Sequence, residues 1–168
     1  TSRAGLFGLS TALWNRTSVE PENPMAVNIE KDELAFFPFL YWPVTADEAT
    51  PSAAAYEKLN RYLRTGGMIL FDTRDGDIAG LSGTTPEGQA LQRIAAGLDI
   101  PPLEQIPQDH VLTRSFYLLK DFPGRFVDSP LWVEASPPDA EQAKGMPFRN
   151  LNDGVTPVII GGNDWAAA

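Results

Sequence analysis

The chain has 168 residues, with 13 Lys and Arg, 22 Asp and Glu, and a formal net charge of -9. This acidic balance argues against nucleic-acid binding, because neutralising phosphates requires a basic face. The chain has no Cys and one His, which excludes thiolate nucleophiles, disulfides and zinc sites built from several His or Cys ligands. We expect one domain over residues 1–168, large enough to bury a core without metal, cofactor or disulfide.

The first predicted elements are a helix and a buried strand. Leucines at helical spacing, with Phe7 and Trp14, predict a short amphipathic helix over residues 4–15. The aromatic run 36–44 is too short for a typical helix and contains two prolines, so it predicts a strand that starts after Pro38 and exits at Pro43. We expect Trp42 and the Phe residues of this run to lie in the core.

A helix and a second strand follow. Thr50 and Pro51 form a cap-plus-proline signal that predicts the start of a helix, and Gly66 and Gly67 predict its end. The apolar run 68–71 follows at once and ends in Asp72, which predicts a short buried strand. Helix, Gly turn and strand together indicate one unit of a parallel sheet.

The rest of the chain repeats this pattern. Thr85 and Pro86 carry a second cap signal before an apolar helical face, and residues 155–160 predict a third strand that exits into a Gly-Gly-Asn-Asp turn. Residues 131–135 indicate a further strand at an edge of the sheet, while residues 47–50 and 136–145 predict surface loops. The result is an α/β fold with an open, mostly parallel sheet and helices on both faces.

Ligands bind beyond the carboxyl ends of strands in open α/β sheets. If the strands are adjacent, the polar residues that follow them converge on one cleft, and His110 and Arg114 supply an imidazole and a cation from another segment. The candidate ligand-binding residues are Asp72, Arg74, His110, Arg114, Asn163 and Asp164. No catalytic residue and no metal ligand is assigned.

Each of these positions also has a purely structural interpretation. The segment 72–77 is either a hard-cation or polar-ligand site or a turn whose Asp residues bond their own backbone. His110 serves either as an acid–base group or as a residue that orients a loop. The turn at residues 161–164 either holds an anion with its backbone N–H groups or caps a helix. The segment 80–84 lacks the final Gly of a nucleophile elbow, since Thr84 stands there.

Several segments together resemble an uncharacterised bacterial domain family: LAFFPFLYWPV, YLRTGGMILFDTRD, DHVLTRSFYLL with FPGRF, and VIIGGNDWAAA. Members of that family look similar to class I glutamine amidotransferase-like proteins of flavodoxin-like fold. They often lie C-terminal to BatA-like double-transmembrane segments. The resemblance therefore implies a soluble domain of a longer, membrane-anchored bacterial protein, on the periplasmic side, with further sheet elements after Ala168.

The resemblance also sharpens the meaning of the missing Cys. Amidotransferases of that superfamily use a Cys nucleophile, so this chain cannot hydrolyse glutamine by that route. We expect a non-catalytic binding or interaction domain, with a protein partner or a small polar ligand. The alternative is a hydrolase or ligand-binding domain for a polar substrate such as a carbohydrate, with Asp72, Asp75 or Asp164 as acid or base.

Overall fold

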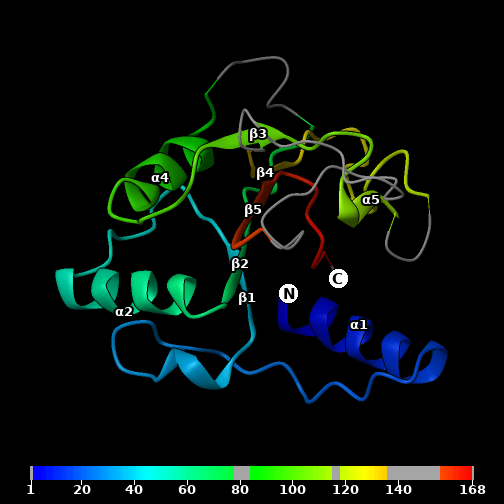
Figure 1. Ribbon diagram of the computed structural model, residues 1–168, viewed down its shortest axis with the longest axis horizontal. Coiled ribbons are helices and arrows are strands. Elements are labelled where there is room, and N and C mark those ends of the chain that lie inside the picture. Colours follow the sequence, from blue (N-terminus) through cyan, green and yellow to red (C-terminus); the bar gives the residue numbers. More distant parts are fainter. Residues whose placement is uncertain (1, 78–83, 115–117, 136–155, 168) are drawn as a thin grey trace, which may run out of the picture.

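The computed structural model describes residues 2–77, 84–114, 118–135 and 156–167. Its centre is a five-stranded sheet of order β1-β2-β5-β4-β3 (Figure 1). The strands are β1 (Phe39–Pro43), β2 (Met68–Asp72), β3 (Leu103–Gln105), β4 (Trp132–Glu134) and β5 (Val158–Gly161). β1, β2 and β5 are parallel neighbours, and only β4 runs against the other four. The predicted open, mostly parallel sheet is confirmed.

The helices within the described residues are α1 (Ser2–Arg16), α2 (Ala53–Arg64), α4 (Pro86–Ala95) and α5 (Val111–Arg114), with a 3₁₀ turn η1 (Leu34–Phe36). Figure 1 shows α2 and α4 on one side of the parallel strands and α1 and α5 toward the other. None of these helices is long and apolar enough to cross a membrane.

The hydrophobic core lies between the parallel strands and the α2–α4 layer. Alternate residues of the strands, including Trp42, Phe71 and Val158, face buried side chains such as Leu59 of α2 and Ile94 of α4. The rings of Trp42 and Phe71 lie 5.3 Å apart. The predicted core position of Trp42 is therefore confirmed, but those of Phe36 and Phe39 are wrong. η1 ends before the strand and leaves the Phe36 ring 82% exposed, and Phe39 at the start of β1 is 44% exposed.

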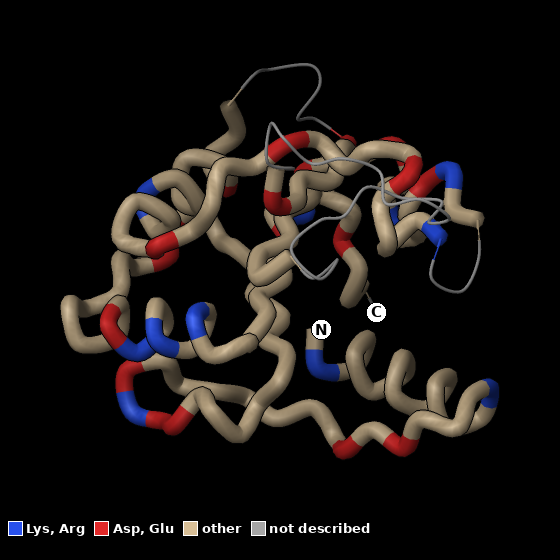
Figure 2. The backbone as a smooth tube through the Cα atoms, viewed as in Figure 1, with Lys and Arg blue, Asp and Glu red and all other residues tan. Residues whose placement is uncertain are grey.

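The helix α1 is confirmed as an element, but its predicted apolar face is not buried. No residue of α1 is buried, and Phe7, Leu9 and Trp14 are each more than half exposed. The cause is the distribution of its apolar residues, which surround the helix instead of forming one stripe. Figure 2 shows that the charged residues of α1 are all basic and lie near its two ends, although the chain as a whole has a net negative charge.

The start of α2 differs from the prediction. The N-cap is Ser52, whose hydroxyl accepts a hydrogen bond from the Ala55 N–H at 3.1 Å, and not Thr50. Ser52 is held in place because its own N–H and hydroxyl both donate to the carboxylate of Glu30. The end of the helix agrees with the prediction: Gly66 takes the left-handed conformation, with φ +97°, immediately after the C-cap residue.

The start of α4 agrees with the prediction and extends it. The hydroxyl of Thr85 accepts from the Gly88 N–H at 2.9 Å and donates to the carboxylate of Asp75. Thr73 donates to the same carboxylate at 2.5 Å. Asp75 therefore ties the N-terminus of α4 to the end of β2, and both Asp75 and Thr85 are buried.

We expect Thr85→Ala to destabilise the protein by about 2–3 kcal/mol, the sum of a lost N-cap and a buried carboxylate that loses one donor. Thr85→Ser keeps both hydrogen bonds and should stay within about 1 kcal/mol of the parent. Urea unfolding of both variants measures this difference, with the exposed neighbour Thr84→Ala as control. Equal midpoints for Thr85→Ala and Thr84→Ala would contradict the assigned role.

One further prediction about the sheet needs correction, and one strand was not predicted. β4 lies inside the sheet, between β5 and β3, and not at an edge. The edge on that side of the sheet is β3, which the sequence did not reveal because it has only three residues and none of them is buried. Its backbone pairs with β4, from Leu103 opposite Glu134 to Gln105 opposite Trp132. The predicted loop at residues 136–145 and the segment 80–83 lie outside the described residues.

Candidate functional site

A fully buried carboxylate organises the carboxyl edge of the sheet. Asp72 ends β2 and is 0% exposed. One oxygen accepts from the N–H groups of Arg74 and Asp164, each at 3.1 Å. The other accepts from the Tyr41 hydroxyl at 2.6 Å and the Trp165 N–H at 2.9 Å. Asp72 therefore joins the exits of the three parallel strands, β1, β2 and β5.

This arrangement decides between the two interpretations of the turn at residues 161–164. The turn does bind an anion with consecutive backbone N–H groups, those of Asp164 and Trp165, but the anion is the protein's own Asp72 carboxylate. After it, residues 164–167 form a single turn, with the Ala167 N–H bonded to the Asp164 carbonyl at 3.2 Å.

The buried carboxylate also acts on Tyr41. Burial is the main cause that raises the pKa of this phenol, and the hydrogen bond to Asp72 adds to the effect, because ionisation would place two negative charges in contact. Tyr41 is therefore protonated at neutral pH and acts as the donor of this bond.

Asn163 fixes a second segment against the strand ends. It is 0% exposed, and its Nδ2 donates to the carbonyls of Phe126 at 2.9 Å and Phe122 at 3.4 Å. The backbone carbonyl of Asn163 accepts from the Phe126 N–H at 3.1 Å. Gly124 lies so close to it that a Cβ there would approach the Asn163 carbonyl oxygen to 2.5 Å. Asn163 is thus a structural anchor that positions the adjoining Arg125.

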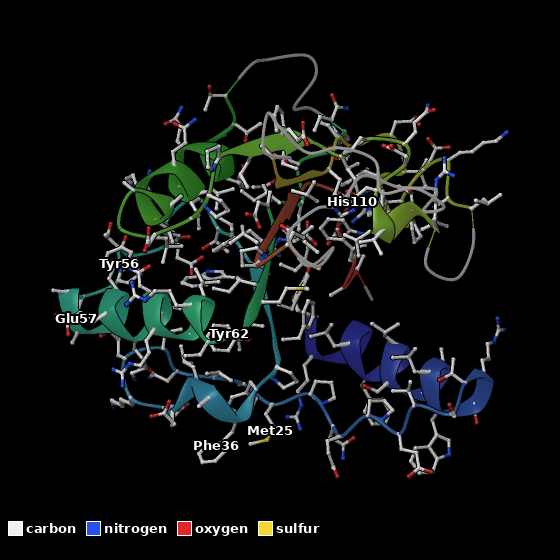
Figure 3. The ribbon with its side chains drawn as sticks, in the orientation of Figure 1. Met25, Phe36, Tyr56, Glu57, Tyr62 and His110 are labelled. Carbon is white, nitrogen blue, oxygen red and sulfur yellow. The ribbon has the colours of Figure 1, made fainter. Side chains whose placement is uncertain are left out.

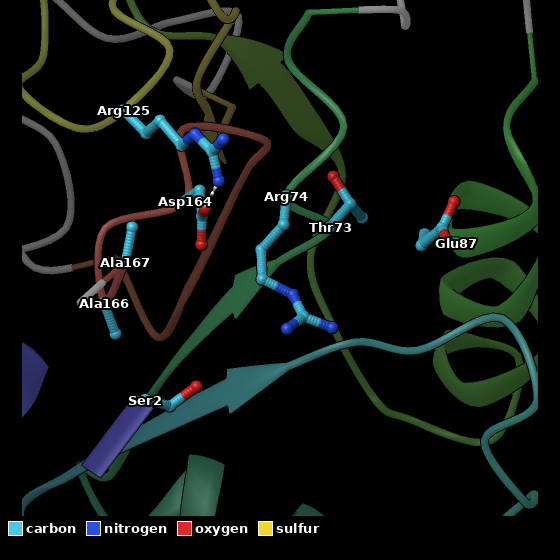
Figure 4. Close-up of a pocket in the computed structure, with 8 residues that line it drawn as sticks. All are labelled: Ser2, Thr73, Arg74, Glu87, Arg125, Asp164, Ala166 and Ala167. Atoms are coloured by element: carbon cyan, nitrogen blue, oxygen red, sulfur yellow. Dashed lines mark ion pairs between the residues drawn. The ribbon is translucent and has the colours of Figure 1, made fainter. Parts of the chain in front are cut away.

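A pocket of about 400 Å³ opens above these buried groups, at the carboxyl ends of the strands (Figure 4). Six of its eight lining residues are polar. The eight lining residues come from five regions of the chain that the fold brings together: Ser2, Thr73, Arg74, Glu87, Arg125, Asp164, Ala166 and Ala167. This is the place where open α/β sheets hold their ligands.

Two arginines and two carboxylates give the pocket its charge. Figure 4 shows Arg74 in the middle, Glu87 on the α4 side and the Arg125–Asp164 pair on the other side. The pair is long, at 3.7 Å, and the Arg125 side chain is 67% exposed. Arg74 and Asp164 both have φ +55°, a left-handed conformation that is unusual outside glycine.

The sequence model of a family described as Domain of unknown function (DUF4159) matches residues 1–168. The chain belongs to this family. The resemblance to an uncharacterised domain family is therefore confirmed, while the likeness to amidotransferases and the membrane-anchored context stay predictions. No curated protein matches the chain.

Four of the six candidate residues come together in this DUF4159 domain, as the adjacency of β2 and β5 required. Arg74 and Asp164 line the pocket, and Asp72 and Asn163 form its buried support. His110 and Arg114 are not among the lining residues; His110 lies next to α5 (Figure 3), and Arg114 is the last residue of that helix. Arg114 is exposed and donates to the Gln108 carbonyl at 3.3 Å.

His110 is buried, with 2% of its surface exposed, and starts α5. Its Nδ1 accepts from the Leu112 N–H at 3.2 Å, so the neutral ring carries its proton on Nε2. Desolvation lowers the pKa of His110 below its ordinary value, although Glu104 and Asp109 oppose that shift. These contacts support the interpretation of His110 as a residue that orients a loop.

The lowered pKa predicts a pH dependence of stability. The unfolded chain, with a His pKa near about 6.5, binds the proton more readily than the folded protein, so stability is lost as the pH falls below that value. We expect the free energy of unfolding of the parent to fall between about pH 7 and 5 by more than that of His110→Asn, with a difference of at most about 1.4 kcal/mol per pH unit. Denaturant unfolding at several pH values measures this; parallel curves would contradict it.

The cation hypothesis for residues 72–77 lacks the ligands it requires. Across the described residues, no three His, Asp or Glu side chains lie close enough together to hold a metal ion. The carboxylates of Asp72 and Asp75 each bind their own separate set of protein donors. The segment is a turn whose Asp residues bond nearby groups, as the alternative interpretation stated.

Sequence reasoning missed five polar residues of the site: Ser2, Tyr41, Thr73, Glu87 and Arg125. A signal existed for Thr73 and Glu87, because Thr73 directly follows a predicted strand end and Glu87 lies in the first turn of a predicted helix. Arg125 had none, since its segment has no regular structure and reaches the site only through Asn163.

Proposed function

We propose that this chain is a non-catalytic binding domain that holds a small polar ligand in the pocket at the carboxyl edge of β1, β2 and β5. The observation that carries the proposal is the pocket itself, which combines a volume of about 400 Å³ with six polar lining residues at the ligand-binding edge of an α/β sheet. We further propose a flavodoxin-like fold related to the amidotransferases, in which the Cys nucleophile is missing.

The hydrogen bonds that the buried carboxylates already make to protein donors favour a binding role over hydrolysis. Of the three Asp residues considered as acid or base, Asp72 and Asp75 are buried and bonded to protein donors. Only Asp164 lines the pocket, and it pairs with Arg125. The second carboxylate of the pocket, Glu87, lies on the α4 side, with the Arg74 side chain between it and Asp164 (Figure 4). A glycosidase needs two carboxyl groups on either side of one substrate bond, and a cation held between them favours a ligand that is bound and not cleaved.

The test is a titration followed through the backbone amide signals of the isotope-labelled protein. A panel of sugars, amino acids, hydroxy acids and phosphates is added at up to about 10 mM, which detects ligands of millimolar affinity. We expect at least one compound to shift the amides of Thr73, Arg74 and Asp164. Ala167→Trp should abolish the effect by filling the pocket from an exposed position, whereas Ala46→Trp, also exposed but outside the pocket, should not.

Two results would contradict the proposal. One is the absence of any shift at these amides across the whole panel. The other is turnover of a nitrophenyl ester or glycoside that disappears in Asp164→Asn, which would establish the hydrolase alternative.

We also propose, on the resemblance of the sequence, that the domain is the soluble part of a membrane-anchored bacterial envelope protein, on the periplasmic side. Antibodies against the domain should detect the parent protein in the membrane fraction, and external protease should degrade the domain in spheroplasts. Recovery in the soluble fraction, or protection from external protease, would overturn the corresponding part of this proposal.

A further inference from the structure

Arg74 is held at the centre of the pocket by its surroundings. Its backbone N–H donates to Asp72, and its Nη2 donates to the Val44 carbonyl at 3.1 Å. Its φ of +55° is one that an Arg rarely adopts and that Asn or Gly would adopt more readily. The backbone conformation alone therefore does not explain an Arg at this position.

The guanidinium of Arg74 has an unused donor. Its Nε is buried and has no hydrogen-bond partner in the described part of the protein. A buried donor without an acceptor is unfavourable, and a carboxylate or phosphate group relieves it by accepting from Nε and a neighbouring Nη together. Since Arg74 lines the pocket, a small movement of its side chain away from Val44 would bring both donors to a ligand.

Arg125 provides a second cation. Its pair with Asp164 is long and largely exposed, and such pairs contribute little and open readily. The Asp164 side chain is much less exposed, at 14%, so it remains part of the pocket lining when Arg125 moves. Glu87 on the α4 side disfavours a ligand that is anionic throughout, and accepts from hydroxyl or amino groups instead.

Resting on the proposed binding function, we infer that the ligand is a small molecule with one oxyanion group, a carboxylate or a phosphate, which binds Arg74, and with hydroxyl or amino groups that face Glu87. Arg125 adds attraction to the oxyanion from the other side of the pocket. The inference names the recognition group of the ligand, and Arg74 is the residue that selects it.

The test compares three probes at constant ionic strength: glycolate, inorganic phosphate and ethylene glycol, which is the neutral counterpart of glycolate. We expect glycolate, phosphate or both to shift the amides of Thr73 and Asp164, and ethylene glycol to leave them unchanged. Arg74→Asn should weaken the binding by about tenfold to a hundredfold. This variant removes the guanidinium and suits the left-handed backbone, so it should fold at least as well as the parent.

Arg93→Gln is the matched control. Arg93 also donates from its Nη2 to a backbone carbonyl, that of Ala46 at 3.2 Å, but it is not among the residues that line the pocket. Binding of the anions should be unchanged in this variant. A preference for phosphate over glycolate, or the reverse, identifies which oxyanion the site takes.

The outcomes separate this inference from the proposed function. If neutral polar molecules bind in the pocket and the two anions do not, the inference fails and the binding function stands. Anion binding that is equally strong in Arg74→Asn also overturns the inference. If no molecule of the polar panel binds, both fail.

Discussion

Replacing Asp72 by Ala is expected to lower the free energy of unfolding by about 3–5 kcal/mol, among the largest effects of any single substitution. The change leaves four donors without their acceptor: the Tyr41 hydroxyl and the N–H groups of Arg74, Asp164 and Trp165. Asp72→Asn keeps the shape but turns an NH₂ group toward N–H or O–H donors, so we expect a loss of about 2–4 kcal/mol.

Chemical unfolding measured by fluorescence and by circular dichroism tests this prediction. Asp77 is the matched control, because it is a carboxylate of the same segment that is exposed to solvent. Asp77→Ala and Asp77→Asn should change the free energy of unfolding by no more than about 0.5 kcal/mol. The assigned role of Asp72 is wrong if its two variants unfold at the same denaturant concentration as those of Asp77.

Asn163 gives the second large effect. We expect Asn163→Ala to cost about 2–3 kcal/mol, because two carbonyls of the segment 122–126 lose their donor and a cavity replaces the side chain. Asn163→Asp should cost more, about 3–5 kcal/mol, since a carboxylate would face those carbonyl oxygens in a site that is 0% exposed.

The control for this pair is Asn60→Ala. The half-buried Asn60 amide also donates to a backbone carbonyl, that of Gly97 at 3.2 Å, and accepts from the Asp99 N–H at 2.7 Å. Because both hydrogen bonds are exposed to solvent, the cost should be about 1 kcal/mol or less. Urea unfolding gives the three values. A smaller loss for Asn163→Asp than for Asn163→Ala would show that the carboxylate is tolerated, and would refute the assignment of Asn163 as a buried donor.

The elements that the sequence predicted well are those with local causes. The strands at Phe39–Pro43 and Met68–Asp72 are apolar runs bounded by Pro, Gly or Asp, and the start of α4 is a Thr-Pro cap. These signals depend on backbone conformation and burial within a few residues. β3 has no such signal, because its pairing with β4 joins residues about thirty positions apart.

The same distinction holds for the site. The convergence of Arg74 and Asp164 followed from two strand exits, once β2 and β5 were taken as neighbours. The roles of Asp72 and Asn163 did not follow, because a sequence shows a polar residue after a strand but not which donors or acceptors surround it. Asp72 and Asn163 are both 0% exposed, so they support the pocket from below and do not contact a ligand directly.

His110 is a different case, because the sequence offered two interpretations and its contacts support the one in which it orients a loop. A lone His in a chain without Cys drew a functional hypothesis from its chemistry alone, since its ordinary pKa lies near neutrality. The structure places it at the start of α5, with its Nδ1 bonded to the backbone of Leu112. That a chain contains only one His therefore does not show whether this His lies in a functional site.

The position of β5 in the sheet has a consequence for the order of folding. β5 is the last described strand in the chain, yet it lies at the centre of the sheet and joins β1-β2 to β4-β3. The Asp72 carboxylate receives its bonds from Asp164 and Trp165, more than ninety residues later. The sheet cannot be continuous, nor Asp72 receive these bonds, before β5 is in place, so the site forms only after this long-range pairing.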